Sequence, residues 1–256
     1  MRRRQPPRQG KSLRRIKRVM IGVVNVCSAT GGVRSMVKPD NTPYRIYCAG
    51  PLFNPSERAE MEMLAETLEQ AGFETFLPHR DGLLFGVMVA DLLKAGYPLE
   101  AAQWMARQAI FALDVYHVLM ECDGALVNLN GRVPDEGALV EGAIAWMAGK
   151  AVVLFKDDAR SLIAGLDNPL VAGLGSFRFV SHADDLPGAI SRALTEPASD
   201  ALRVESLPAV VRQGVERGQR IAEVAGTGNS TQLVRTIIQL FDEFQGAARR
   251  LARSSP

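Results

Sequence analysis

The sequence predicts an α/β protein with a doubly wound parallel sheet of about five strands and a C-terminal helical extension. Strand-like segments alternate with helical patterns, and each strand-like segment is continuously apolar. Strands that helices cover on both faces have this composition, because neither face of such a sheet contacts water. With 47% hydrophobic residues in 256 positions, the chain can also bury a sizeable core.

The strands are predicted from short apolar runs that stop at turn residues. The first run ends at Gly50 and Pro51, and the second ends at Pro78. Glycine and proline pairs interrupt sheet and helix alike, so they mark the strand ends. The five predicted strands are residues 45–49, 73–77, 124–129, 151–155 and 177–180.

The first helix is predicted over residues 54–71 from its end signals. Asn54 can cap the helix, Pro55 suits its first position, and Glu57 completes the spacing of a capping box. Gly72 follows the last helical residue, where glycine commonly closes a helix. These signals define both ends of the helix from local sequence alone.

Further helices are predicted from apolar positions three or four residues apart. They cover residues 99–121, which include Asp114, residues 135–147 and residues 183–194. Residues 79–98 contain Asp81-Gly82 and few periodic signals, so we predict a long loop with room for one helical turn. Long loops in compact domains usually carry function.

The composition changes after Thr195. Two amphipathic helices, residues 207–224 and 231–251, are predicted to form a hairpin whose apolar stripes pack in the core or against another subunit. The sequence therefore divides into a basic extension (1–40), an α/β domain (41–195) and a helical hairpin (196–256).

The formal net charge of +2 conceals two different regions. Residues 1–38 carry eleven Lys or Arg and no acidic residue, which leaves 19 basic and 28 acidic residues from position 39 onward, a net charge of −9. We expect no nucleic-acid partner for this acidic part. The basic segment has three interpretations: an unstructured extension translated from a start upstream of Met36, which we favour, a cleaved targeting sequence, or a nucleic-acid-binding arm.

Cysteine and hydrophobic patterns exclude several classes of protein. Cys27, Cys48 and Cys122 have no partner at metal-ligand spacing, so we expect buried free thiols in a reducing cytoplasm, without a metal site or disulfide framework. The longest apolar run, residues 19–26, is too short to span a bilayer, and no membrane partner is expected.

Several common catalytic motifs are missing. No Gly-x-Gly-x-x-Gly follows the first strand and no Gly-x-x-x-x-Gly-Lys-Ser/Thr is present, so we expect neither NAD nor ATP chemistry. No Gly-x-Ser-x-Gly elbow occurs, and His79, His117 and His182 have no obvious Ser or Cys partner. Carboxylates are the remaining candidates.

Residues 135–145 (DEGALVEGAIA) place Asp135 at a helix start and Glu141 two turns later. Ala138 and Ala145 lie three and four positions from Glu141 and Gly142 follows it, so these small residues let the helix closely approach a sheet or a ligand. Together with Asp114, these acids suit cleavage of a glycosidic bond near the strand ends, where ligands of doubly wound sheets bind. An acid at a helix start is, however, most often a plain cap.

Four segments of the chain, taken in order, carry a family resemblance. They are residues 45–58 (RIYCAGPLFNPSER), residues 71–82 (AGFETFLPHRDG), Asp114 with residues 122–125 (CDGA), and residues 135–145. Over about residues 44–190 the chain resembles the nucleoside 2-deoxyribosyltransferase family. The resemblance implies a flavodoxin-like, Rossmannoid fold and exchange of the base on a 2′-deoxynucleoside, with small-molecule nucleosides and nucleobases as substrates and no cofactor.

The resemblance also assigns roles to four residues. It implies that Glu141 is the nucleophile of a covalent deoxyribosyl intermediate, that Tyr47 orients it, that Asp114 protonates the leaving base, and that Asp135 holds the sugar 5′-hydroxyl. The roles are physically coherent, because an ionised carboxylate stabilises a cationic sugar and a protonated one needs a raised pKa.

Further substrate contacts are implied by the same match. The residues are Gly50, Pro51, Phe53, Asp81 and Gly137. Asn168, in the segment DNPL, resembles a family asparagine that reaches a neighbouring subunit's sugar, so we expect a homo-oligomer, a dimer or larger.

The chain departs from the family pattern at two places. Ala138 stands where many relatives have Thr or Ser, and the chain continues for about 60 residues past the family core, whose members can use their terminal carboxylate near the site.

Two alternative functions stay open. One is an N-glycosidase that hydrolyses nucleosides or nucleoside 5′-monophosphates. Relatives that hydrolyse nucleoside 5′-monophosphates have a small hydroxyl residue where this chain has Asp135, whose charge would repel a phosphate. The other is a non-catalytic nucleotide-sensing module.

Overall fold

The computed structural model describes residues 42–131, 133–158, 167–196 and 206–241. All of them belong to one compact unit, Met36–Pro256. The predicted basic extension, residues 1–40, lies outside the described residues, and so do Cys27 and the last ten residues of the predicted helix 231–251. The proposed division at residue 195 stays a prediction.

The described residues form a five-stranded parallel sheet in the order β2-β1-β3-β4-β5. This order, with helical crossovers between the strands, is that of flavodoxin-like doubly wound proteins, so the predicted fold class is confirmed. The strands are β1 (Arg45–Ala49), β2 (Glu74–Phe76), β3 (Gly124–Asn128), β4 (Ala151–Phe155) and β5 (Phe179–Val180).

Strand ends agree with the predictions to within two residues. The largest difference is β5, which was predicted to begin at residue 177 and begins at Phe179. Ser176 and Phe177 have φ angles of 53° and 61°, in the left-handed region, so the chain turns there and cannot yet be extended.

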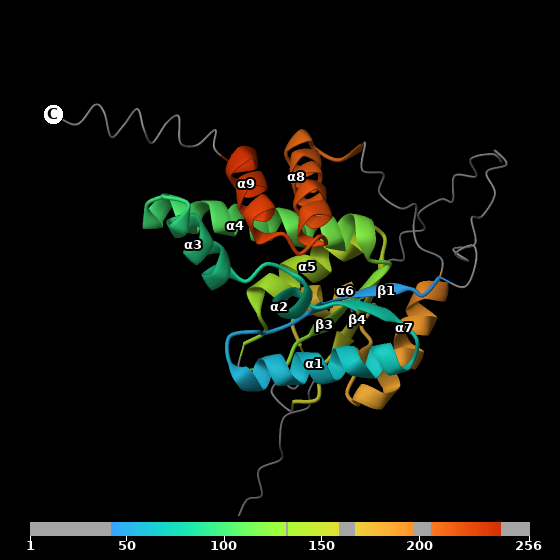
Figure 1. Cartoon of the computed structure of the whole chain (residues 1–256). Coiled ribbons are helices and arrows are strands. Elements are labelled where there is room, and N and C mark those ends of the chain that lie inside the picture. The colour runs from blue at the N-terminus through green and yellow to red at the C-terminus, as the bar shows by residue number, and fades with distance from the viewer. Residues whose placement is uncertain (1–41, 132, 159–166, 197–205, 242–256) are drawn as a thin grey trace, which may run out of the picture. The chain divides into compact units, whose positions relative to one another are not determined.

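Alternate residues of β1 face opposite sides of the sheet, and each side has its own helical layer (Figure 1). Ile46 and Cys48 pack with α1 (Pro55–Gln70) and α7 (Leu186–Thr195), the latter preceded by the 3₁₀ turn η2 (Ala183–Asp185). Tyr47 and Ala49 pack with α5 (Glu136–Met147), and α6 (Pro169–Leu174) contacts α5 and β4 on that side.

The end signals of α1 act as predicted. The Asn54 side chain accepts a hydrogen bond from the Glu57 backbone N–H at 3.0 Å, and the Glu57 carboxylate accepts one from the Asn54 N–H at 3.2 Å. This capping box satisfies backbone donors that an unprotected helix start leaves without partners.

The prediction of a long loop over residues 79–98 is wrong. The structure has two helices there, α2 (Pro78–Asp81) and α3 (Phe85–Lys94). Leu84, the residue before α3, forms no side-chain cap, so the sequence lacks a start signal. Burial of Met88, Val89 and Leu92 against neighbouring helices stabilises α3 instead.

The predicted helix over residues 99–121 is confirmed as α4 (Leu99–Tyr116) continued by a π-helical turn, η1 (His117–Glu121). The helical hairpin, α8 (Ala209–Ala225) and α9 (Ser230–Phe241), packs with α3 and α4 around a separate apolar core (Figure 1). Its apolar stripes are therefore core residues.

The small residues of α5 let this helix lie close to the sheet. Ala138, Gly142 and Ala145 are buried, and a Cβ added to Gly142 would lie 2.8 Å from the nearest methyl carbon of Val127 on β3. That distance is shorter than ordinary van der Waals contact, so glycine is needed at this position. Close packing here fixes the position of Glu141, the residue before Gly142 in the chain.

Two of the three cysteines lie within the described residues. Cys48 and Cys122 are buried free thiols, as predicted. No helix in the described parts of the chain combines the length and the apolar character that crossing a membrane requires.

Candidate active site

Tyr47 and Glu141 form the central contact of the site. The Tyr47 hydroxyl, at the end of a fully buried side chain on β1, donates a hydrogen bond to Glu141 Oε1 at 2.7 Å. The two residues are 94 positions apart, and the close packing of α5 on the sheet brings them together. The hydrogen bond joins the Glu141 carboxyl to β1, and the orienting role expected for Tyr47 stays a prediction.

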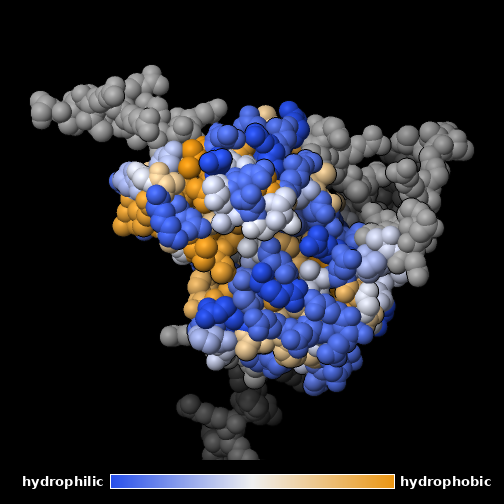
Figure 2. Space-filling model, viewed as in Figure 1, coloured by the Kyte–Doolittle hydropathy of each residue, from blue (hydrophilic) through white to orange (hydrophobic). Residues whose placement is uncertain are grey.

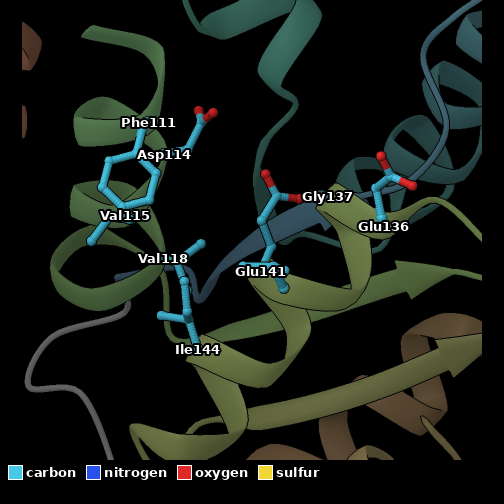
Figure 3. Close-up of a pocket in the computed structure, with 9 residues that line it drawn as sticks. Phe111, Asp114, Val115, Val118, Glu136, Gly137, Glu141 and Ile144 are labelled. Carbon is cyan, nitrogen blue, oxygen red and sulfur yellow. The ribbon is translucent and has the colours of Figure 1, made fainter. Parts of the chain in front are cut away.

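Asp114 and Glu141 line the same pocket, which lies between α4 and α5 and has a volume of about 280 Å³. This is close to the lower end of the range for small-molecule sites, about 300–1,000 Å³. Figure 3 shows the two acids projecting from facing helices. The residues that line the pocket are Phe111, Asp114, Val115, Val118, Glu136, Gly137, Val140, Glu141 and Ile144.

Both pocket carboxyls hold protons more tightly than ordinary acids. Burial raises the pKa of Asp114 to about 7, although the Tyr47 hydroxyl partly opposes this. Burial, and then the neighbouring charge of Asp114, raise the pKa of Glu141 to about 8; the hydrogen bond from Tyr47 opposes the shift and Asp135 adds to it. Two such groups titrate as a pair, which retains a proton near neutral pH.

Asp135 is the N-cap of α5. Its carboxylate accepts a hydrogen bond from the Ala138 N–H at 2.7 Å, so the plain capping role considered from the sequence is present. Asp135 is also close enough to Glu141 to raise its pKa. Capping and an electrostatic role in the site are therefore compatible.

The other predicted substrate residues lie differently. Gly137 lines the pocket, whereas Gly50 and Pro51 are buried at the end of β1 and do not line it. Phe53 is 80% exposed, and Asp81 accepts a hydrogen bond from the Leu77 N–H at 2.8 Å while pairing with Arg80. The pocket as described contains neither Phe53 nor Asp81.

Asn168 is exposed and caps α6, where its side chain accepts a hydrogen bond from the Leu170 N–H at 2.9 Å. The suggested contact with a neighbouring subunit's sugar is not tested by a single chain and stays a prediction. Among the described residues, no group of three or more His, Cys, Asp or Glu side chains is placed to hold a metal ion.

Sequence reasoning missed the apolar walls of the pocket. On α4 and its continuation η1 the lining positions are 111, 114, 115 and 118, and on α5 they are 136, 137, 140, 141 and 144. These spacings of three and four place each set on one helix face. The signal was present in the sequence, since each acid lies inside an apolar stripe of its own helix.

The fold and the pocket define a flavodoxin-like α/β protein in which two carboxyls of raised pKa face an apolar cavity. The chain matches the family model described as nucleoside 2-deoxyribosyltransferase over residues 46–208, and it belongs to this family.

Two solved structures are similar to the chain. One, a conserved protein from Enterococcus faecalis V583, is 22% identical with a TM-score of 0.43, over 59% of this chain and 99% of the other. The second is the 2-deoxyribosyltransferase of the psychrotolerant bacterium Bacillus psychrosaccharolyticus. It is 20% identical with a TM-score of 0.42, and the match covers 62% of this chain and 99% of the other. No curated protein matches the chain.

Proposed function

We propose that the protein transfers the 2-deoxyribosyl group of a nucleoside from one nucleobase to another, with Glu141 as the nucleophile. The observation that carries this proposal is the hydrogen bond from the buried Tyr47 hydroxyl to Glu141, in a pocket that Asp114 shares. Membership of the family supports the reaction class. Glu141, Tyr47 and Asp114 are the catalytic residues of the proposal.

In the first half of the reaction, a carboxylate oxygen of Glu141 bonds to the anomeric carbon of the sugar. The bond between that carbon and the base nitrogen breaks, and its electron pair goes to the base. Asp114 supplies a proton to the departing base, which leaves as a neutral molecule. The transition state resembles an oxocarbenium ion, so the negative charge of Glu141 stabilises it before the covalent bond is complete.

The raised pKa values supply the proton that this step needs. A pair that retains a proton near neutral pH offers one carboxylate and one acid together. A cationic sugar beside Glu141 favours its ionised form, and so does the Tyr47 hydrogen bond. A base nitrogen that accepts a hydrogen bond favours the protonated form of Asp114.

In the second half, a nitrogen of another base attacks the anomeric carbon and displaces Glu141, while the proton of the incoming base passes to Asp114. Two displacements at the same carbon retain its configuration. If water attacks instead, the product is the free sugar and the reaction is hydrolysis. The apolar walls of the pocket favour a flat base as the second reactant.

The proposed substrate is an unphosphorylated nucleoside. Asp135 lies at the start of α5 with its charge near Glu141, where we propose that it binds the 5′-hydroxyl. A phosphate dianion at the same place would be repelled by several kcal/mol, as an order of magnitude for a partly buried site. A nucleoside 5′-monophosphate is therefore the poorer substrate.

Incubation of the protein with deoxyinosine and adenine tests the proposal, with the products separated by chromatography. New deoxyadenosine is expected. Hypoxanthine without deoxyadenosine would instead indicate a hydrolase, and unchanged substrates would favour the sensing module. Glu141→Gln should lower turnover on the order of a thousandfold, whereas Glu66→Gln, on the exposed side of α1, should leave it unchanged. Full turnover by Glu141→Gln would disprove the nucleophile assignment.

A further inference from the structure

The helix α8 lies outside the part of the chain that matches the family. The match ends at residue 208, and α8 begins at Ala209. Nevertheless α8 packs along α4, the helix that carries Asp114 (Figure 1). An element that the family model does not include therefore supports one wall of the active-site pocket.

At Gly218 the two helices lie too close together for a side chain to fit. Gly218 is buried, and a Cβ added there would overlap the carbonyl oxygen of Ala112 and lie 2.5 Å from the Cβ of Tyr116. Both obstacles belong to the body of α4, and a backbone carbonyl cannot turn aside as a flexible side chain can. Any side chain at position 218 must therefore push α8 and α4 apart.

The contact with α8 lies on the opposite side of α4 from Asp114. Successive residues of a helix are rotated by about 100°, so Ala112 and Tyr116 are each rotated by about 200° from Asp114. Gly218 thus packs against the face of α4 that is opposite to Asp114, whose carboxyl faces the pocket. A displacement of α4 at this point would move Asp114 with it.

A second contact reaches the pocket wall itself. Val215, one turn before Gly218, is buried against Val115 and Tyr116, and Val115 lines the pocket. The hairpin also holds α8 in place, because the Arg217 guanidinium lies 5.3 Å from the ring centre of Phe241 on α9. The position of α8 is therefore fixed on both sides.

We propose that α8 is a positioning element of the active site. Because Gly218 has no side chain, α8 and α4 pack closely, and this packing determines the distance between Asp114 and the leaving base. This inference rests on the function proposed above. Proton transfer requires the acid within hydrogen-bond distance of its acceptor, and a displacement on the order of 1 Å is costly to the rate. Gly218 itself does not touch the substrate.

The test compares two glycine variants of the full chain. In Gly218→Ala the added methyl group forces the helices apart. Gly214→Ala is the matched control, because it lies one turn earlier on the same helix and a Cβ there meets no atom within 4 Å. Both changes replace glycine by alanine inside α8, so the intrinsic gain in helix propensity is the same.

Two substrates distinguish a misplaced acid from general damage to the protein. The base of 2′-deoxyguanosine needs a proton to leave as a neutral molecule. The base of N7-methyl-2′-deoxyguanosine already carries a positive charge and leaves as a neutral molecule without one. The rate of base release in a single turnover, with protein in excess and no acceptor base added, is measured for the unaltered chain and for both variants. The temperature is one at which circular dichroism shows that all three are folded.

Gly218→Ala should lower the single-turnover rate of base release from 2′-deoxyguanosine on the order of tenfold to a hundredfold, and from the methylated substrate less than about threefold. Gly214→Ala should change neither rate. Equal losses on both substrates, or no loss at all, would overturn the proposal. No turnover of either substrate by the unaltered chain would remove the proposed function itself, which is a different result.

Val215→Ala provides an independent variant if Gly218→Ala does not fold. It adds no atom but loosens α8 behind Val115, so the same difference between the substrates should appear, with a smaller size. Equal rates for Val215→Ala and the unaltered chain on both substrates would count against the proposal.

Discussion

Tyr47 shows how one buried side chain can favour the reactive form of another. Burial raises the pKa of Tyr47 well above its usual value, and the nearby charges of Glu141 and Asp114 raise it further. The hydroxyl therefore stays protonated near neutral pH, and it donates to Glu141 whenever that carboxyl is ionised. A donor at 2.7 Å stabilises the ionised form of Glu141, which is the form that the proposed nucleophile needs.

Replacing Tyr47 by Phe removes this donor and leaves the ring in place. We expect Tyr47→Phe to lower kcat for base exchange about tenfold to a hundredfold, because Glu141 loses both its orientation and a stabilising hydrogen bond. The melting temperature should change little, since the phenyl ring fills the same buried space. A melting temperature that falls sharply along with kcat would point to damaged packing instead of lost orientation.

The two pocket acids predict the pH dependence of the reaction. With pKa values raised to about 7 for Asp114 and about 8 for Glu141, kcat/KM should follow a bell centred near neutral pH. At lower pH both groups are protonated and no nucleophile is present. At higher pH both are ionised and no acid is present.

Asp114→Asn tests which group causes the decline of kcat/KM at low pH. The variant removes a negative charge that raises the pKa of Glu141, so this pKa should fall and activity should persist to lower pH. Both profiles are measured with N7-methyl-2′-deoxyguanosine, whose departure needs no acid, so that the variant stays active and the declines at low pH can be compared. If activity declines at the same low pH in the variant and in the unaltered chain, the coupling between the two residues is contradicted.

At the scale of single elements, local signals predicted most of the framework. Both β1 and β4 have the bounds that their apolar runs and turn residues predicted, and α1 begins at its predicted capping box. Helix α3 was missed because it lacks a capping residue and is stabilised by packing against α4 and α9. Tertiary packing, not local preference, determines such a helix.

The same distinction applies to the site. Family motifs selected Tyr47, Asp114 and Glu141. The structure places the two acids in one pocket, with Tyr47 hydrogen-bonded to Glu141. Phe53 and Asp81 belong to equally well matched segments but lie outside it. Neither the cavity nor the support of α4 by α8 could be predicted from motifs, because both depend on how separate helices pack.

Asp135 serves α5 as a cap, and we propose that it also serves the site as a charge. The two roles separate in a pair of variants. Asp135→Asn keeps a capping side chain, so the free energy of unfolding should change by less than about 0.5 kcal/mol, whereas Asp135→Ala should lose about 1 kcal/mol. Denaturant titration measures both values.

Loss of the Asp135 charge should also change substrate preference. In both variants the rate with a nucleoside 5′-monophosphate relative to the nucleoside should rise about tenfold, because a repelling carboxylate is gone. If the preference stays the same in both variants while Asp135→Ala loses stability, Asp135 is only a cap.

At the scale of the whole molecule, one apolar surface has no described partner within the chain. Figure 2 shows apolar residues gathered over α3 and the adjoining end of α4. We call this the α3/α4 surface. Its large exposed apolar side chains are Leu84, Phe85, Val87, Leu93 and Leu99. Contiguous apolar surfaces of this kind commonly mark contacts between proteins.

We predict that the protein is a homo-oligomer, a dimer or larger, and that the α3/α4 surface contributes to the contact. Light scattering should then give a mass at least twice the 27.8 kDa of one chain. Val87→Glu places a charge on this surface, where 51% of Val87 is exposed, and should lower the measured mass because an unpaired charge is costly to bury. Met63→Glu, at a 43% exposed apolar position on α1, is the matched control and should leave the mass unchanged. A single-chain mass for the unaltered protein would refute the oligomer, and a mass unaffected by Val87→Glu would place the contact elsewhere.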